Sequence, residues 1–423
     1  MHDTAVDADV LNAPTLRLCF EERIIAMDLI WQRADALAQH PRLVIWEMLP
    51  ARYLADWDSQ GATGIELASL PLSFAEGCKL IDQVARFGTP PPSLLLTGAD
   101  PLQRPDICDL VRYATRQELP VTISLSGTPL LTATRLQDLK DAGASAITLA
   151  LDGSTPELHD NVHHMAGSFE QTVAGARAAH AIGLEPTIVS TVTRTNLLDL
   201  PDQLALVRDL HMTTWHVSFP DPHDWAHIED TIAAQDYEAA LNLLYDIRRF
   251  LRVTTNASRH FRRVTLQRMV LEAWNLPVEY HLRLNATYRQ LKARLFAVTW
   301  ERGRPPPTGY IQHTPPPNYV PGSCLFVAHQ GDVFPDGDRS HRAGNVRETA
   351  LVDIYHQSPA FRTPPDMPIL PARCSHCEFR WMCGAGQAWL NMLTGGSWDE
   401  PLCAYEPGTF PFASDVLALA GVN

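Results

Sequence analysis

The sequence has no long uninterrupted run of apolar residues and no excess of positive charge. None of its apolar runs approaches the roughly 20 residues that a helix needs to span a bilayer, so we expect no membrane partner. Its 34 lysine and arginine residues are outnumbered by 48 aspartate and glutamate residues, which gives a formal net charge of −14. Because a surface this acidic repels phosphate backbones, the composition argues against nucleic acid as a partner.

Sequence signals of several other classes are also missing. Residues 1–7 lack the basic and apolar regions of a signal peptide, so a cytoplasmic location is expected. The chain has neither a Gly-x-Ser-x-Gly nucleophile elbow nor a phosphate-binding Gly-x4-Gly-Lys-[Ser/Thr] loop. What is present is a chain of 423 residues that is 45% hydrophobic and 19% charged, which is enough to bury a large core.

Short apolar runs alternate with segments of helical spacing from about residue 43. The predicted strands are 43–46, 93–97, 121–125, 146–151, 186–192 and 214–219. The helical segments between them are 74–87, 106–117, 133–142, 168–182 and 200–210. Continuous apolar strands with helical crossovers indicate a parallel sheet covered by helices. The sequence therefore predicts an α/β fold with a partial six-unit (β/α) barrel, whose chemistry collects in the loops after the strands.

The rest of the chain suggests how the protein divides into domains. Before the barrel lies a predicted N-terminal extension, and after it come a helix-rich insertion, a proline-rich linker and a cysteine-rich domain. The predicted limits are 1–40 for the extension, 41–303 for the barrel with its insertion, 304–322 for the linker, 323–410 for the small domain and 411–423 for a tail.

Four of the eight cysteines cluster near the C-terminus, at Cys374, Cys377, Cys383 and Cys403. Their spacing is C-x2-C-x5-C-x19-C, which predicts a four-sulfur cage. Such a cage suits either Zn²⁺ or an iron–sulfur cluster, and spacing alone does not choose between them. The isolated cysteines at positions 19, 78 and 108 are predicted to be small apolar residues of the core.

This cysteine run resembles the SPASM or twitch extension that follows many radical S-adenosylmethionine (SAM) barrels. The segments 331–335 (Gly-Asp-Val-Phe-Pro) and 344–346 (Gly-Asn-Val) resemble the same extension. The resemblance implies one auxiliary [4Fe–4S] cluster on the four cysteines, with zinc as the alternative. A second cluster is not expected, because Asp336 and Gln387 stand where its ligands would lie. Cys324 remains from that second set, and its role is left open.

The resemblance extends to the barrel, but the family's radical-generating motif is replaced. In the family a C-x3-C-x2-C loop after the first strand holds the [4Fe–4S] cluster that cleaves SAM. On that register the three positions are Arg52, Asp56 and Ser59. Aspartate and serine offer oxygen ligands, whereas the guanidinium of arginine has no free lone pair.

The motifs that contact SAM in the family have also changed. Gly98-Ala99-Asp100-Pro101 resembles the family's G-G-E-P loop, and Ala150-Leu151-Asp152-Gly153 resembles its S-L-D-G segment. The resemblance implies a vestigial SAM pocket that includes Gly98, Asp100 and Asp152. Turn residues persist while ligand-contacting side chains differ, so SAM binding is in doubt and no catalytic residue is assigned.

Residues 254–263 resemble a segment of radical SAM/SPASM proteins near those of heme and heme d1 maturation. Asn256 stands there in place of an acid. Two interpretations of the adjacent Arg262 and Arg263 remain open. They form either a solvated helix N-terminus or an anion site for a substrate that carries carboxylates.

Three functions are compatible with these features, and the sequence does not decide whether the chain is an enzyme. The first is a pseudoenzyme, or an accessory scaffold for a protein or peptide partner such as an active radical SAM paralogue. The second is an active maturase of heme, cofactor or peptide type with an atypical cluster. The third is a barrel enzyme of different chemistry that uses Arg52, Asp100, Asp152 and His159.

Overall fold

The computed structural model describes residues 40–50, 70–220, 231–301, 324–335, 341–361, 372–383 and 402–419. The predicted extension 1–40, except its last residue, and the linker 304–322 lie outside these ranges. Arg52, Asp56 and Ser59 also lie outside them, as do Asp336 and Gln387. No helix in the described ranges is long and apolar enough to cross a bilayer.

A ten-stranded sheet runs through the described residues in the order β10-β9-β8-β1-β2-β3-β4-β5-β6-β7. Strands β1 to β8 pair in parallel wherever they are neighbours, whereas β9 and β10 are antiparallel additions at one edge. The strands are β1 (Leu43–Glu47), β2 (Ser93–Thr97), β3 (Val121–Leu125), β4 (Ala146–Ala150), β5 (Glu185–Thr191), β6 (Thr214–Ser218), β7 (Arg252–Thr254), β8 (Cys324–Val327), β9 (Asp332–Phe334) and β10 (Gly344–Asn345).

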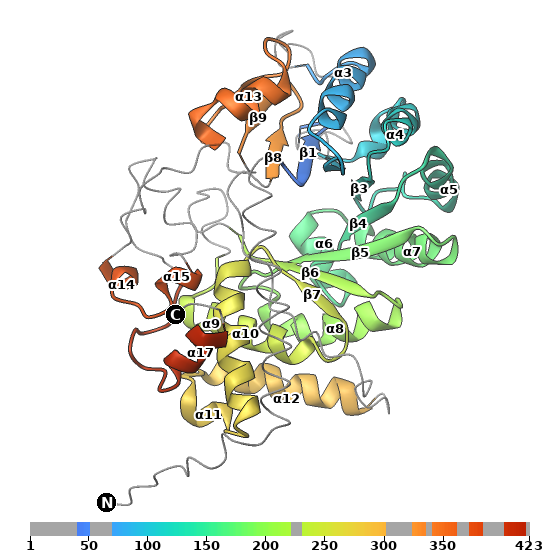
Figure 1. Ribbon diagram of the computed structural model, residues 1–423. Coiled ribbons are helices and arrows are strands. Elements are labelled where there is room, and N and C mark those ends of the chain that lie inside the picture. Colours follow the sequence, from blue (N-terminus) through green and yellow to red (C-terminus); the bar gives the residue numbers. More distant parts are fainter. Residues whose placement is uncertain are drawn as a thin grey trace, which may run out of the picture.

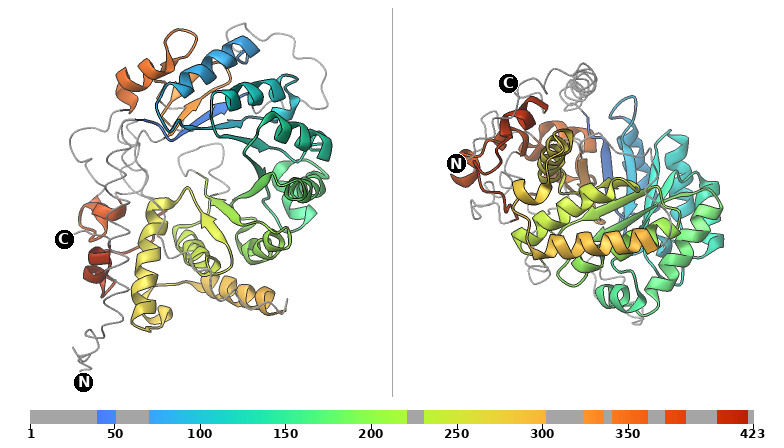
Figure 2. Two further views of the ribbon diagram at one scale, coloured as in Figure 1. Left: turned by 45° about the vertical axis from the view of Figure 1, so that its right-hand side comes forward. Right: turned by 90° about the horizontal axis from the view of Figure 1, so that it is seen from below.

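Helices connect successive strands and line the outside of the curved sheet (Figures 1 and 2). Those of the first six units are α3 (Phe74–Ala85), α4 (Ile107–Arg116), α5 (Ala133–Ala142), α6 (Pro156–His163), α7 (Ser168–Ala181) and α8 (Leu200–Asp209). After β6 come α9 (Ala234–Ile247), α10 (Ser258–Ala273), α11 (Val278–His281) and α12 (Ala286–Glu301). The C-terminal helices are α13 (Leu351–Gln357), α14 (Ala372–Ser375), α15 (Arg380–Cys383) and α17 (Ala413–Leu419).

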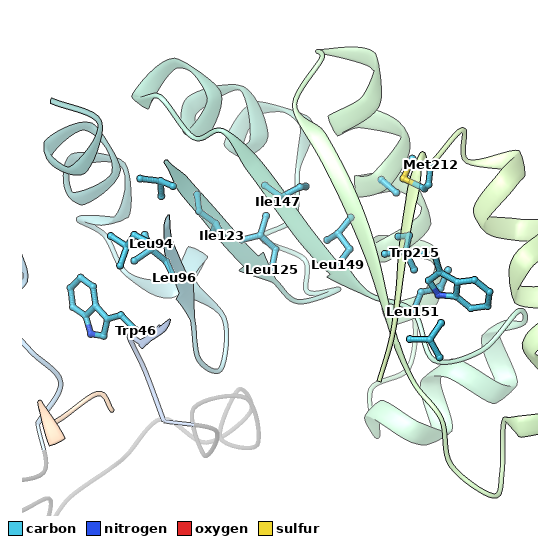
Figure 3. Close-up of a cluster of buried hydrophobic side chains, with 14 of the residues drawn as sticks. Trp46, Leu94, Leu96, Ile123, Leu125, Ile147, Leu149, Leu151, Met212 and Trp215 are labelled. Atoms are coloured by element: carbon cyan, nitrogen blue, oxygen red, sulfur yellow. The ribbon is translucent and has the colours of Figure 1, made fainter. Parts of the chain in front are cut away.

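Alternation along the strands separates an apolar face from a polar one. Every second side chain is fully buried between the sheet and the helices, as Figure 3 shows for Leu94, Ile123, Leu149 and Trp215. The intervening side chains of β3 to β7 are half-buried and mostly hydroxylic: Thr122, Ser124, Thr148, Thr187, Thr191, Thr214, His216, Ser218 and Thr254. The inner face of the barrel is therefore lined by hydrogen-bonding groups rather than by a closed apolar core.

The C-terminal part of the chain continues the barrel sheet. Strand β8 pairs in parallel with β1, with Cys324 opposite Leu43. Beyond it, β9 and β10 form a small antiparallel ladder in which Asn345 Nδ2 donates to Asp332 Oδ1 at 2.9 Å. The Gly-Asp-Val and Gly-Asn-Val segments that resembled the SPASM extension thus contribute adjacent strands.

All six predicted strands are present, and the predicted parallel α/β barrel is confirmed. The prediction did not include β7 or β8. Strand β7 has only three residues, too few for a periodic signal, and β8 follows the proline-rich stretch and pairs with the distant β1.

Candidate functional site

The loop after β2 brings Gly98 against the end of β1. Gly98 has φ +127°, and a Cβ there would lie 2.4 Å from the carbonyl oxygen of Leu49. The backbones of the two segments are hydrogen-bonded, since Ala99 N donates to that same oxygen at 3.1 Å. Glycine is therefore required at this position because no side chain fits between the two loops.

Asp100 is completely buried, and both of its carboxylate oxygens accept hydrogen bonds from the protein. Oδ1 accepts from the backbone N–H of Leu102 at 3.0 Å and caps the short 3₁₀ helix Pro101–Gln103. Oδ2 accepts from the Thr128 hydroxyl at 2.6 Å. Burial raises the pKa of Asp100, although these two hydrogen bonds act in the opposite direction. The carboxylate thus fastens the β2 loop to the β3 loop.

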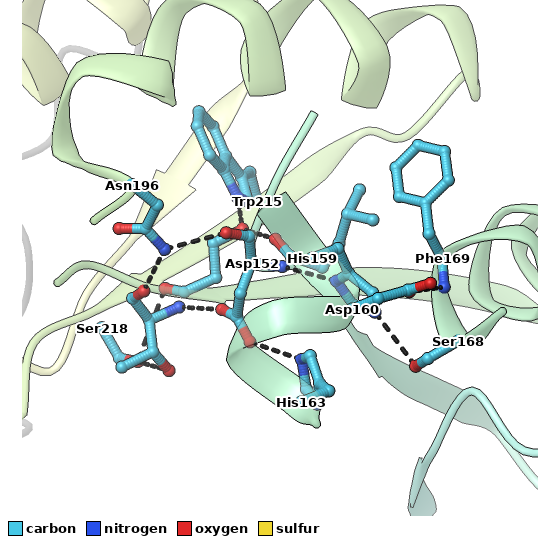
Figure 4. A network of polar contacts seen from close by, with 12 residues as sticks. Asp152, His159, Asp160, His163, Ser168, Phe169, Asn196, Trp215 and Ser218 are labelled. Atoms are coloured by element: carbon cyan, nitrogen blue, oxygen red, sulfur yellow. Dashed lines mark hydrogen bonds and ion pairs between the residues drawn. The ribbon is translucent and has the colours of Figure 1, made fainter. Parts of the chain in front are cut away.

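Asp152 follows β4 and is the centre of a polar network at the carboxyl ends of β4, β5 and β6 (Figure 4). Its Oδ1 accepts from the backbone N–H of Thr191 at 2.5 Å, and its Oδ2 lies 2.8 Å from Nε2 of His163. Asn196 Nδ2 joins the same strands by donating to the carbonyl oxygens of Asp152 and Thr191. Asp152 is only 5% exposed, and its hydrogen bonds join the ends of two neighbouring strands.

His159 lies in helix α6 and is hydrogen-bonded to the backbone of Asp152. Its Nδ1 accepts from the backbone N–H of Asp152 at 3.1 Å, so the neutral ring carries its proton on Nε2, which lies 3.1 Å from the Ser168 hydroxyl. Burial is the main cause that lowers the pKa of His159 to about 4, with the neighbouring His163 adding to it. The ring is therefore neutral at pH 7 and connects the backbone of Asp152 to the hydroxyl of Ser168.

The sequence did not single out His163 as a partner of Asp152, nor a second acid–histidine pair at the end of β1. There, Glu47 Oε2 lies 3.0 Å from Nδ1 of His329, in the turn after β8. Both Glu47 and His329 are buried. The pair of Asp152 with His163 could have been found from the sequence, because both residues follow closely after strand β4. The pair of Glu47 with His329 had no such local signal, because its members meet only through the pairing of β1 with β8.

Cysteines 374, 377, 383 and 403 lie on two segments that pack against α10, where α15 and α17 appear beside that helix in Figure 1. The backbone N–H of Cys377 donates to the carbonyl of Cys374 at 3.1 Å and forms a tight turn. Arg373 joins the second segment to the first by donating to the carbonyl oxygens of Cys403 and Tyr405.

The cysteine segments and α10 share a small apolar cluster, separate from the barrel core. It is formed by Leu266, Val270, Leu271, Phe379, Tyr405, Phe410 and Val416, with Cys377 and Cys403 packed against it. Burial raises the pKa of the Cys377 and Cys403 thiols, whereas the nearby guanidinium of Arg263 acts to lower both values. The thiols of Cys377 and Cys403 therefore lie in a sheltered place near the buried guanidinium of Arg263.

The solvated interpretation of Arg262 and Arg263 is wrong, because both side chains are buried and Arg263 is only 1% exposed. Arg263 forms a two-pronged ion pair with Glu238 of α9, at 3.0 and 2.5 Å. Its Nη1 also donates to Gln267 at 2.8 Å, and its guanidinium lies 5.0 Å from the centre of the Tyr405 ring. Such burial costs free energy unless the charge is paired.

The donor chemistry of the four cysteines fits a sulfur-ligated metal or cluster. Cys377 and Cys403 pack against the same apolar cluster, and Cys374 and Cys377 share one tight turn. In the described residues, no three His, Cys, Asp or Glu side chains stand in an arrangement that would hold a metal ion. The kind and spacing of the four cysteines suit such a site, whereas their arrangement in the described residues does not form one, so the four-cysteine site remains a prediction.

Comparison with known proteins shows which family has this architecture. Residues 76–203 match the family model described as the Radical SAM superfamily. An AdoMet-dependent heme synthase from Methanosarcina barkeri is 29% identical over 376 residues, covering 88% of this chain and 99% of that protein. Another from Oleidesulfovibrio alaskensis is 30% identical over 381 residues, covering 88% of this chain and 89% of that protein.

The fold also resembles that of a solved structure. Streptococcus suis SuiB bound to S-adenosylmethionine matches with a TM-score of 0.55 at 11% identity, over 88% of this chain and 78% of that one. At this identity the likeness concerns the fold alone. Taken with the near-complete alignment to the heme synthases, the parallel barrel with its polar inner face identifies the chain as a member of the radical SAM superfamily.

Proposed function

We propose that this chain is a radical SAM family protein that no longer cleaves SAM and acts as an accessory or scaffold partner in heme or related cofactor maturation. The observation that carries the proposal is the absence of a cysteine triplet before residue 324. Only Cys19, Cys78 and Cys108 precede it, each alone, and the family's cluster positions hold Arg52, Asp56 and Ser59.

The two described cysteines of the barrel cannot substitute for the missing ligands. Cys78 lies in α3 and Cys108 lies in α4, and both side chains pack against the apolar core on the helix side of the sheet. A SAM-cleaving cluster belongs in the loop after a strand, at the carboxyl ends of the strands, rather than among the helices that cover the sheet. The positive charge of Arg52 adds a further obstacle to iron in that loop.

The internal engagement of two carboxylates supports the same proposal. The oxygens of Asp100 and Asp152 are occupied by Thr128, Leu102, Thr191 and His163. Both residues are also no more than 5% exposed, which leaves little room beside these donors for the amino group of a ligand. Asp100 and Asp152, which resemble SAM contacts of the family, therefore join adjacent loops within this fold.

The membership of the family implies an iron–sulfur group, and the C-terminal thiols are where this chain would hold it. Cys374, Cys377, Cys383 and Cys403 would be the ligands, and the group would supply either an electron-transfer centre or a structural cross-link. The similarity to heme synthases suggests that the partner is an enzyme of heme-type cofactor maturation.

The experiment is metal and sulfide analysis of anaerobically reconstituted protein, with a matched Cys383→Ser variant. About four iron atoms per chain, lost in the variant, together with no 5′-deoxyadenosine from SAM under reducing conditions, is the expected result. About eight iron atoms, of which about four survive in the variant, would mean that the barrel assembles its own cluster. Reductive cleavage of SAM would refute the accessory role.

A second candidate is an active heme synthase with an atypical cluster. The alignment over 99% of the Methanosarcina barkeri protein favours it, because the whole architecture is retained. It requires oxygen ligation by Asp56 and Ser59. An Asp56→Ala variant that keeps the iron content of the parent would remove this candidate, whereas a loss of about four iron atoms would favour it.

A further inference from the structure

The polar network around Asp152 contains a carboxylate–imidazole pair at the carboxyl ends of the barrel strands. Asp152 Oδ2 accepts a hydrogen bond from Nε2 of His163, the last residue of α6, at 2.8 Å (Figure 4). The two side chains differ in exposure, since that of Asp152 is 7% exposed and that of His163 is 30% exposed. The carboxylate is therefore enclosed by the protein, whereas the imidazole that it holds reaches solvent.

This pair fixes which nitrogen of His163 carries the proton. An ionised carboxylate can only accept hydrogen bonds, so the proton of the neutral ring lies on Nε2 and the lone pair lies on Nδ1. Nδ1 has no hydrogen-bond partner among the described residues, and it is not one of their buried polar atoms. The lone pair is thus held in one orientation and is open to a molecule that approaches from solvent.

His159 supports the ring of His163 without adding a charge. The two ring centres are 4.3 Å apart, and the rings are inclined by 33°. His159 is itself fixed by the backbone N–H of Asp152, and burial lowers its pKa to about 4, so it is neutral at pH 7. A buried acid that orients an imidazole whose other nitrogen is open is the arrangement in which enzymes hold a general base.

The groups beside this pair indicate what kind of molecule suits it. The hydroxyls of Thr191 and Ser218 lie 3.2 Å apart at the ends of β5 and β6, and the N–H of Thr191 donates to the other oxygen of Asp152. Hydroxyls can donate to a carbonyl oxygen. None of these groups is a permanent cation, and the ionised Asp152 repels a negative charge. The chemistry therefore suits an uncharged carbonyl compound rather than an anion.

We propose that Asp152 and His163 form a general-base site for uncharged carbonyl compounds, in which His163 accepts the proton and Asp152 is its positioning residue. The inference depends neither on SAM nor on the four cysteines. In the hydrolysis of an ester, Nδ1 takes a proton from water while the water oxygen bonds to the carbonyl carbon. The bond to the leaving alcohol then breaks with its electron pair, and the imidazolium releases its proton to solvent.

The test uses the full-length protein and p-nitrophenyl acetate, an uncharged ester whose hydrolysis releases a coloured phenolate. A positioned general base contributes about 10²–10⁴-fold to a rate, so we expect His163→Gln to lower the saturable rate of hydrolysis about 100-fold. The matched control is His164→Asn, which removes the next imidazole along the chain. His164 is exposed and has φ +51°, a conformation that asparagine tolerates, so this variant should hydrolyse the ester like the parent.

Asp152→Asn tests the positioning role while His163 is retained. The amide oxygen of the variant has to keep accepting from the Thr191 N–H, so its NH₂ group faces His163 and donates to Nε2. The ring proton then moves to Nδ1, and no lone pair faces solvent. We expect a loss of about 100-fold in the rate, a change of tautomer in the ¹⁵N NMR spectrum and an unchanged circular dichroism spectrum.

A chemical probe of the parent keeps the test independent of the variants at position 163. Diethyl pyrocarbonate should modify Nδ1 of His163 faster in the parent than in Asp152→Asn, as followed by mass spectrometry. Equal rates of modification would show that the carboxylate does not hold the lone pair open. The proposal is overturned by that result, by a parent that hydrolyses the ester no faster than His163→Gln, or by equal losses in His163→Gln and His164→Asn.

Discussion

Replacing Asp100 tests whether this carboxylate is structural or contacts a ligand. In the Asp100→Ala variant the Leu102 N–H loses its cap, and the Thr128 hydroxyl loses its acceptor. Loss of a cap costs about 1 kcal/mol, and a buried hydroxyl whose proton has no acceptor costs about 1–3 kcal/mol. Removing a buried charge returns part of that cost, because burial disfavours the ionised form of Asp100. We therefore expect a net destabilisation of about 2–3 kcal/mol.

The assay is urea unfolding followed by circular dichroism, with SAM binding measured in parallel by calorimetry. The control is Asp100→Asn, whose amide oxygen still caps Leu102 and whose shape is conserved, so the loss of stability should be about 1 kcal/mol or less. If the carboxylate is structural, the urea concentration at the unfolding midpoint should rise from the alanine variant to the asparagine variant to the parent. The reasoning is refuted if Asp100→Ala unfolds at the midpoint of the parent, and all the more if that variant then loses measurable SAM binding.

Three further predictions concern other parts of the two sites. Gly98→Ala should destabilise the protein by more than about 2 kcal/mol, because the new Cβ would meet the Leu49 carbonyl at 2.4 Å and φ is +127°; a midpoint unchanged in urea unfolding would contradict this. The pKa of His159 is lowered to about 4, so its neutral form contributes stability that is present above pH 6.5 and lost as pH falls toward 4. The free energy of unfolding should decline across that window by on the order of 3 kcal/mol, and His159→Gln should flatten the profile. Cys383→Ser should reduce bound zinc or iron more than Cys78→Ser, whose thiol packs in the core, as metal analysis will show.

The sequence was sufficient for the first six strands of the barrel because local patterns specify them. Each predicted strand is an apolar run whose alternate side chains, such as Val44 and Trp46, are buried against helices. Strand β7 was missed because its three residues carry too little periodicity, and its place is fixed by pairing with β6. Contacts between distant segments, such as Glu47 with His329, leave no local trace in a single sequence.

The candidate sites were predictable to a different extent. Glycine and aspartate at positions 98, 100 and 152 were identified from motif resemblance, but the motif could not reveal that the carboxylates are used within the fold. The charge of Arg263 was visible, whereas its burial was not, since that depends on Glu238 and on Tyr405 from another part of the chain. A single sequence therefore shows which residue stands at a position, but it does not show which distant residues surround that side chain.

The parallel pairing of β1 with β8 has a consequence for the order in which the protein is made. Strand β1 leaves the ribosome early, finds β2 soon afterwards, and must wait for residues 324–327 before its other side is covered. Until then its N–H and C=O groups form an open edge on which a second nascent chain can pair. A barrel produced alone, ending before β8, would keep that edge permanently. Residues 324–327, which are made after the preceding strands of the barrel, thus protect its first strand from pairing with another chain.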